Sequence, residues 1–189
     1  MNHVAPFRVP AIAAVILLAT ACVSTPREPP GASVAAPVAA RAPGPAIDGF
    51  RQPRPGLHAG GQPAATAWRA MAGQGVDTVI NLRPDAELAG RDEAAEVRAA
   101  GMAYRVIPVA GAADITRANA ARLWAALAQT PGPVAVHCSS GNRVGALLAI
   151  GAATRGGMDT ETAIAFGRAA GLGKAEARVR EVLAEPTAQ

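Results

Sequence analysis

The residues best suited to chemistry lie in one short polar loop that begins at Cys138 and ends at Arg143. The apolar run 134–136 before it predicts a buried strand, and the small and aliphatic residues after Arg143 predict a helix. A strand–loop–helix turn of this kind points several backbone N–H groups and a helix N-terminus at one place. This arrangement favours the binding of an anion. The same positive field favours the thiolate form of Cys138. The planar guanidinium of Arg143 suits a bidentate grip on phosphate-like oxygens.

Each of these residues also has a simpler interpretation. A cysteine after a strand is often only a small core residue, and the pair Gly141 and Asn142 is typical of a turn. Packing, however, gives no reason for an arginine at the end of the loop. A nucleophile, an anion-binding loop and a guanidinium this close together in the chain therefore indicate a catalytic site.

The composition narrows the class of protein. Half of the 189 residues are apolar and only 3% are aromatic, so we expect a core built from small side chains. The formal net charge is +4, but the basic residues are scattered and not interleaved with aromatic ones, which argues against a nucleic-acid partner. The three histidines and two cysteines show no spacing typical of a metal site. We therefore expect neither a metal nor another cofactor.

Residues 1–21 are predicted to be a signal peptide. Arg8 and the N-terminal amine form a weakly basic start, and the apolar run 11–18 is too short for an ordinary membrane span. The small residues 19–21 directly before Cys22 resemble the lipobox of bacterial lipoproteins, in which Cys22 would be lipidated. A plain secretory signal, in which Cys22 has no role, is the alternative. We expect a lipid anchor at the periplasmic face of the bacterial cell envelope, at the outer membrane rather than the inner one.

Residues 22–56 form a predicted tether. Eight of the sixteen prolines of the chain fall between residues 23 and 56, and this density prevents helices and central strands. A semi-extended spacer of this kind would hold a folded domain away from a membrane.

Residues 57–185 alternate between strand and helix signals and are predicted to form one domain. Such alternation with short connections indicates an α/β fold, with a mostly parallel sheet of four or five strands flanked by helices. Ligands of such sheets bind beyond the carboxyl ends of the strands, where the Cys138 loop and the turn 83–87 both fall. The predicted strands are 57–59, 78–82, 104–109 and 134–137, and the predicted helices are 64–72, 92–100, 115–128, 143–154, 160–170 and 175–183.

Four motifs in this order make residues 57–183 resemble a bacterial family, the tyrosine-phosphatase-like domains related to beta-lactamase hydrolase-like proteins. The resemblance implies a three-layer cysteine-phosphatase-like fold and a mechanism through a phosphocysteine. Cys138 would be the nucleophile and Arg143 the phosphate clamp, acting on a phosphorylated or other oxyanion substrate. The motifs are Gly61-Gln62-Pro63, residues 75–84, Ile107-Pro108-Val109 and residues 133–143. The phosphate would be bound by the backbone amides of Ser139, Ser140, Gly141, Asn142 and Arg143.

Two features depart from ordinary tyrosine phosphatases. Four residues separate Cys138 from Arg143, where those enzymes have five, and four is the spacing of many rhodaneses, which carry sulfur on the cysteine. Val144 stands where a serine or threonine usually supports the thiolate leaving group. Two alternatives to a phosphatase therefore stay open: a sulfurtransferase that forms a persulfide on Cys138, and a non-catalytic scaffold domain that binds anions.

Phosphoester cleavage by a cysteine needs a carboxylic acid that protonates the leaving oxygen. The resemblance favours Asp114, in the loop after the third predicted strand, as this acid. Asp114 is equally suited to cap the helix 115–128. Asp85 and Glu87 are the other candidates, on a neighbouring turn. His137 precedes the nucleophile as it does in phosphatases, and would tune the thiolate through the backbone.

Overall fold

The computed structural model describes residues 47–186. The predicted signal peptide, Cys22 and most of the predicted tether lie outside the described residues. Within the described range, no helix combines the length and the apolar character needed to cross a membrane.

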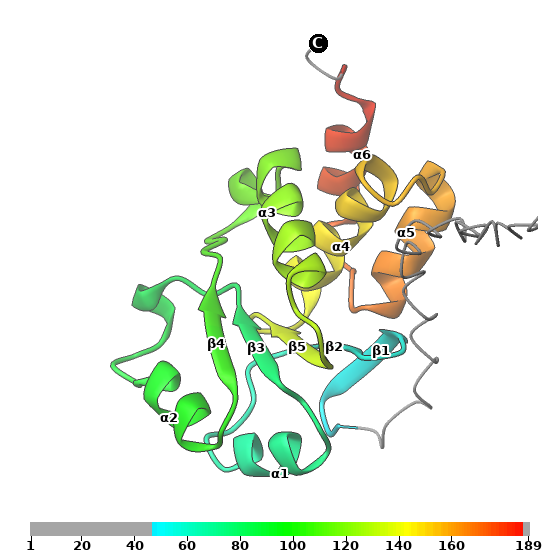
Figure 1. Cartoon of the computed structure of the whole chain (residues 1–189). Helices are drawn as coiled ribbons and strands as arrows, with labels where there is room; N and C mark the ends of the chain where they lie inside the picture. Colours follow the sequence, from blue (N-terminus) through cyan, green and yellow to red (C-terminus); the bar gives the residue numbers. More distant parts are fainter. Residues whose placement is uncertain (1–46, 187–189) are drawn as a thin grey trace, which may run out of the picture. The chain divides into compact units, whose positions relative to one another are not determined.

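A five-stranded mixed sheet lies at the centre of the domain (Figure 1). One edge pairing, β1 with β2, is antiparallel, and the other three pairings are parallel. The mostly parallel α/β fold predicted from the sequence is therefore confirmed. In sheet order the strands are β1 (Phe50–Arg54), β2 (Leu57–Gly60), β5 (Val134–His137), β3 (Thr78–Asn81) and β4 (Ala103–Val106).

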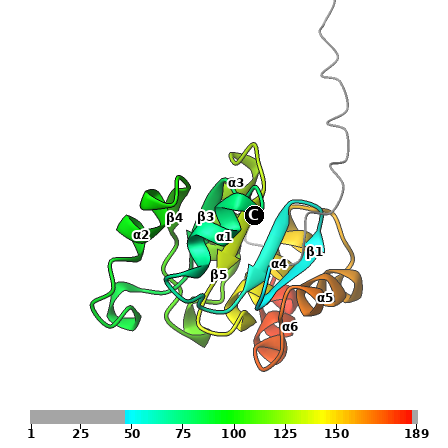
Figure 2. The same cartoon turned by 90° about the horizontal axis from the view of Figure 1, so that it is seen from below.

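Helices cover both faces of the sheet and complete three layers (Figure 1). Helices α1 and α2 lie on one face, and α3, α4, α5 and α6 lie on the other. Seen from below, α5 lies beside the β1 edge and α2 beside the β4 edge (Figure 2). The helices are α1 (Ala67–Gly73), α2 (Glu93–Ala99), α3 (Arg117–Ala128), α4 (Asn142–Thr154), α5 (Thr160–Ala169) and α6 (Glu176–Ala184), with short 3-10 helices η1 (Asp85–Glu87) and η2 (Ala112–Asp114).

Strand β5 and helix α4 hold the polar loop between them. All four side chains of β5 are buried, as expected for a short apolar strand with parallel neighbours on both sides. Nine residues of α4 are also buried, so this helix is apolar on most of its surface and packs inside the domain. Both ends of the loop that joins them are therefore anchored in the core.

The predicted boundary between tether and domain at residue 57 is wrong, because β1 already belongs to the sheet. Pro53 lies within this strand, at a point where its register against β2 shifts between Arg51 and Arg54. An edge strand tolerates a proline where a central strand does not. Proline density therefore concealed a strand that the structure shows at the sheet edge.

Other element boundaries also differ from those predicted by one to three residues, and two of these differences have a clear physical reason. Strand β4 ends at Val106, because Pro108 has no N–H and interrupts the regular pairing, although Val109 still donates to the Leu82 carbonyl at 2.9 Å. Helix α3 begins at Arg117, and its N-cap is Thr116, whose hydroxyl accepts from Asn119 N at 3.2 Å. The capping role predicted for Asp114 is therefore wrong.

Helices α4 and α5 meet through two glycines. A Cβ placed on Gly145 would lie 2.2 Å from the Leu172 amide nitrogen and 2.6 Å from the Gly167 carbonyl oxygen. A Cβ on Gly167 would lie 2.7 Å from the Gly145 carbonyl oxygen. Because the obstructing atoms belong to the backbone, only glycine lets the two helices approach this closely.

We expect Gly145→Ala to lower the free energy of unfolding by about 1–3 kcal/mol, because the extra methyl group would overpack the interface of α4 and α5. Gly73→Ala is the matched control, since a Cβ there meets nothing within 4 Å, and should leave stability equal or higher by up to about 1 kcal/mol. Chemical denaturation of the two variants checks this. Equal free energies of unfolding for the two variants would show that α4 and α5 can move apart to admit the methyl group without loss of stability.

Candidate active site

The polar loop, defined here as the 138–143 loop, follows the central strand β5 and is held by the backbone that follows β2. Cys138 N donates to the Gly60 carbonyl at 3.3 Å, and Gln62 N donates to the Ser139 carbonyl at 3.3 Å. A single antiparallel bridge joins Gly61 to Ser140 between these two bonds. The loop is thus paired along its first half with the segment 60–62.

The backbone of the loop curls around the sulfur of Cys138. Gly141 has φ +86°, a left-handed conformation that residues other than glycine rarely adopt, and its N–H donates to Cys138 Sγ at 3.1 Å. The amides of Ser139 and Ser140 make no hydrogen bond with another described residue. Helix α4 begins directly afterwards, so its first amides also lack intrahelical acceptors. The loop therefore gathers free N–H groups over a buried thiol.

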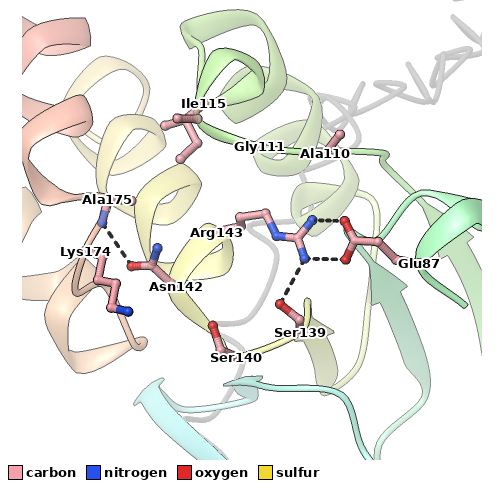
Figure 3. Close-up of a pocket in the computed structure, with 11 residues that line it drawn as sticks. Glu87, Ala110, Gly111, Ile115, Ser139, Ser140, Asn142, Arg143, Lys174 and Ala175 are labelled. Atoms are coloured by element: carbon pink, nitrogen blue, oxygen red, sulfur yellow. Dashed lines mark hydrogen bonds and ion pairs between the residues drawn. The ribbon is translucent and has the colours of Figure 1, made fainter.

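Arg143 turns back over the loop and is held by four hydrogen bonds; those to Glu87 and Ser139 are drawn in Figure 3. Its Nη1 and Nη2 each donate to one carboxylate oxygen of Glu87 at 2.7 Å. Nη1 also donates to the Val109 carbonyl, and Nη2 to Ser139 Oγ at 3.1 Å. A guanidinium has five N–H donors, and in the described part of the chain the Nε–H is the one without an oxygen acceptor, while the Cys138 sulfur lies close enough to interact with the guanidinium. That donor, together with the exchangeable bond to Ser139, leaves room for a bidentate contact with an oxyanion.

Glu87 and Arg143 stabilise each other's charged forms. The hydrogen bond from Arg143 lowers the pKa of Glu87, and burial, which opposes this change, is the smaller effect. The same hydrogen bond raises the pKa of Arg143. An acid catalyst must carry a proton at working pH, and Glu87 is held in its ionised form. This geometry disfavours Glu87 as the general acid.

A pocket of about 490 Å³ opens above the loop. Small and aliphatic residues of the segment 110–115 form one wall, and Lys174, the only lysine of the chain, lies on the opposite wall (Figure 3). Asn142 joins this wall to the loop, since its Oδ1 accepts from Gly173 N at 2.8 Å and from Ala175 N at 3.2 Å. The lining residues are Glu87, Ala110, Gly111, Ala112, Ile115, Ser139, Ser140, Asn142, Arg143, Lys174 and Ala175.

Asp114 lies beside the pocket rather than in its lining. Its Oδ2 accepts a hydrogen bond from Ala110 N at 2.8 Å, and its carbonyl accepts from Asn119 Nδ2 at 2.8 Å. The carboxylate therefore closes the turn 110–114, of which Ala110, Gly111 and Ala112 line the pocket. The role of Asp114 as a general acid stays a prediction, and would require the carboxylate to leave this turn.

A buried polar cluster lies beneath the loop, on the face covered by α1 and α2. Glu93 and His137 are both fully buried, and Glu93 Oε1 lies 2.9 Å from His137 Nε2, although the ring N–H does not point straight at it. Tyr104 donates to Glu93 at 3.1 Å and accepts from Asn81 at 2.9 Å. The Gln62 side-chain amide also donates to Glu93.

The cluster affects the protonation of its members. Burial alone would raise the pKa of Glu93, but the contacts from His137, Gln62 and Tyr104 together outweigh burial, and the pKa lies below its ordinary value. Burial raises the pKa of Tyr104 to about 12, so this hydroxyl is a neutral donor. Glu93 is thus a carboxylate that is both ionised and buried.

The structure brings together most of the site residues that the sequence predicted. Cys138, Arg143 and the amides between them form one cradle, and the turn 83–87 lies against it as expected. Within residues 47–186, no three His, Cys, Asp or Glu side chains are grouped to hold a metal ion. The sequence reasoning gave no role to Glu93, Tyr104 or Lys174. Among the residues of the buried cluster that the sequence analysis did not assign to the site, only Gln62 had a signal in the sequence, because it lies in the motif Gly61-Gln62-Pro63.

Comparison with known proteins gives relatives for this domain. Residues 49–155 match the family described as beta-lactamase hydrolase-like protein, phosphatase-like domain. The beta-lactamase hydrolase-like protein of Xylella fastidiosa (strain Temecula1) is 40% identical over 121 residues, which are 61% of this chain and 28% of that protein. The protein of the same name from Agrobacterium fabrum is 34% identical over 116 residues, 59% of this chain and 27% of that protein. The chain thus spans less than a third of the length of these relatives.

Solved structures with a similar fold include two that are named as phosphatases. A provisionally assigned phosphatase (DUF442) of Shewanella putrefaciens CN-32 is 27% identical with a TM-score of 0.56, over 73% of this chain and 93% of that one. A provisionally assigned phosphatase of Neisseria meningitidis Z2491 is 25% identical with a TM-score of 0.60, over 69% of this chain and 94% of that one. TpbA of P. aeruginosa, 24% identical with a TM-score of 0.54 over 75% of this chain and 91% of that one, shares the fold. The cysteine loop, the three-layer fold and the family match agree, and the chain belongs to the family of phosphatase-like domains of beta-lactamase hydrolase-like proteins.

Proposed function

We propose that this domain hydrolyses phosphomonoesters through a covalent intermediate on Cys138. The observation that carries the proposal is the cradle itself: the Gly141 N–H donates to the buried sulfur of Cys138, the amides of Ser139 and Ser140 are free, and the Arg143 guanidinium interacts with Cys138. These donors match the charge of a phosphoryl group, and they are already in place before a ligand binds. Relatives described as phosphatases support the same chemistry.

The reaction would proceed in two displacements. The thiolate of Cys138 attacks phosphorus, the bond from phosphorus to the ester oxygen breaks, and the departing oxygen takes the proton of Asp114. Water then attacks phosphorus and gives a proton back to Asp114, while the phosphorus–sulfur bond breaks and restores the thiolate. The products are an alcohol and inorganic phosphate. Arg143 and the amides stabilise the charge on the phosphoryl oxygens in both steps.

Two features predict slow turnover. Val144 offers no hydroxyl to support the thiolate when it leaves phosphorus in the second step. Asp114 is also engaged by Ala110 N, and would have to release this bond to reach the leaving oxygen. Loss of one positioned acid or donor costs about 10²–10⁴ in rate. Slow hydrolysis of small aryl phosphates is therefore expected.

We expect Cys138→Ser to abolish hydrolysis of an aryl phosphate while vanadate still binds, because the substitution removes the nucleophile but leaves the amides and Arg143. Phosphate release and vanadate binding measure the two properties. Thiosulfate is assayed in parallel with the unaltered domain. Thiocyanate formation that needs Cys138, without any phosphate release, would instead establish sulfur transfer. Anion binding with neither reaction would establish a scaffold.

We expect Asp114→Asn to slow aryl phosphates with poor leaving groups by about 10²-fold, and those with good leaving groups far less, because only the former need a proton. Asp92→Asn is the matched control, since this exposed residue caps α2 by accepting from Ala95 N. Rates across a series of substituted phenyl phosphates provide the measurement. An equal loss of rate for all leaving groups would show that Asp114 only stabilises the turn 110–114.

We also propose that Cys22 is lipidated and anchors the domain at the periplasmic face of the cell envelope, at the outer membrane. The proposal rests on the short apolar run and the small residues before Cys22. Expression in a bacterial host with labelled palmitate should label the protein, and Cys22→Ala should remove the label because the acceptor thiol is lost. Cys138→Ala is the control and should keep it. An unlabelled, secreted protein would indicate a plain secretory signal.

A further inference from the structure

Glu93 is a carboxylate whose burial has no local explanation. It is the first residue of α2, where an acidic side chain is favoured in solvent by the helix dipole, yet its side chain is fully buried. Burying an ionised carboxylate costs several kcal/mol unless its lone pairs are satisfied, and a well-packed apolar residue is often at least as stable there. The stability of the fold therefore does not by itself explain why an ionised glutamate is buried at position 93.

The first contact of Glu93 leads to the nucleophile. His137 is the last residue of β5 and immediately precedes Cys138. Its Nε2 lies 2.9 Å from Glu93 Oε1, close enough for an ion pair but without an aligned hydrogen bond, and its Nδ1 has no hydrogen-bond partner among the described residues either. The ring of Trp68 packs against it with centroids 5.9 Å apart. Glu93 is thus the polar group that orients this ring, at the point where the strand becomes the loop.

The second contact leads to the phosphate clamp. Gln62 donates to Glu93 with its side-chain nitrogen and accepts from Arg83 with its side-chain oxygen. Arg83 in turn pairs with Glu87, its Nε lying 3.3 Å from the carboxylate, and Glu87 holds Arg143. The charges alternate in sign from Glu93 through Arg83 and Glu87 to Arg143, so each member stabilises the next.

Gln62 also joins the cluster to the loop through its backbone, because its N–H donates to the Ser139 carbonyl. The titratable groups around Glu93 are His137 on β5, Tyr104 on β4, and Arg91 and Glu96 near or on α2. Arg91 and Glu96 form an ion pair with each other. Glu93 therefore makes its contacts with the groups that lead to the 138–143 loop. Both routes from Glu93 therefore end at groups that form the anion cradle.

We propose that Glu93 is a positioning residue: it orients His137 and, through Gln62, Arg83 and Glu87, the guanidinium of Arg143, and so sets the geometry of the 138–143 loop for an anion. The inference rests on the proposed function for its role in turnover. The predicted effect of Glu93 on the geometry of the loop, however, can be measured without enzymatic turnover.

The test is Glu93→Gln, which keeps the size of the side chain and removes the charge. We expect kcat for an aryl phosphate to fall about 10- to 100-fold, since small misplacements of reacting groups cost this much, with a smaller change in KM. Alkylation of Cys138 by iodoacetamide should slow, and vanadate should protect it less. Glu161→Gln is the matched control, the same change at an exposed carboxylate of α5, and should leave alkylation, protection and kcat unchanged.

Gln62→Leu separates the two routes. It cuts the path to Arg83 but leaves the pair of Glu93 and His137, so we expect weaker protection by vanadate with a smaller effect on the alkylation rate. This variant also decides the matter if Glu93→Gln does not fold, which thermal unfolding would reveal. Normal protection in Gln62→Leu would then overturn the proposal.

The outcomes distinguish this inference from the proposed function. If the unaltered domain hydrolyses nothing, but Glu93→Gln still weakens alkylation and vanadate protection, the positioning role holds and the phosphatase activity fails. If the unaltered domain is active and Glu93→Gln changes neither readout nor kcat, Glu93 is only a buried structural residue and the proposal is wrong.

Discussion

The ion pair between Arg143 and Glu87 joins the end of the 138–143 loop to the turn after β3, and it decides where the guanidinium points. A free arginine samples many rotamers, and ordering it on binding costs free energy. Here both Nη groups are already engaged, and the side chain of Arg143 is only 11% exposed. The guanidinium is therefore oriented in advance, with its Nε–H and the exchangeable bond to Ser139 left for a ligand.

This arrangement has an electrostatic consequence for the pocket. The charge of Arg143 is largely balanced by Glu87, so the affinity for an anion must come mainly from the backbone amides of the loop and the N-terminus of α4. Lys174 is the other cation of the pocket lining, and no described carboxylate pairs with it. The site thus combines a fixed cradle with one exposed positive charge at its rim.

The parallel sheet is what allows these contacts to form. In its register, Gly60, His137 and Asn81 lie level with one another at the ends of β2, β5 and β3. The residues that follow, including Gln62, Cys138 and Arg83, therefore emerge side by side at one edge. Loops that are distant in sequence become neighbours there, and a buried charged cluster beneath them can hold all three. Such a cluster adds order to the site rather than stability to the fold.

The sequence alone was sufficient for what depends on short separations. Apolar runs and glycines located nearly every strand and helix, and the spacing of Cys138 and Arg143 identified the anion loop. It failed at β1, where Pro53 is tolerated only because the strand lies at an edge, and at Asp114, where Thr116 caps the helix instead. Both errors arise because residues that are neighbours only in space change which secondary structure or capping role a residue can adopt.

By itself the sequence predicted nearly all of the secondary structure, Cys138 and Arg143 as the candidate nucleophile and clamp, and the side of the sheet on which they lie. Only the tertiary structure decided which groups support them. Glu87 and Arg143 are 56 positions apart, and Glu93 has the sequence position of an ordinary exposed residue in the first turn of a helix. Its burial depends on how α2 packs against β4 and β5, and the energy of a buried carboxylate depends on every partner that surrounds it. Those partners, Gln62, Tyr104 and His137, come from three separate segments, and only folding brings them together.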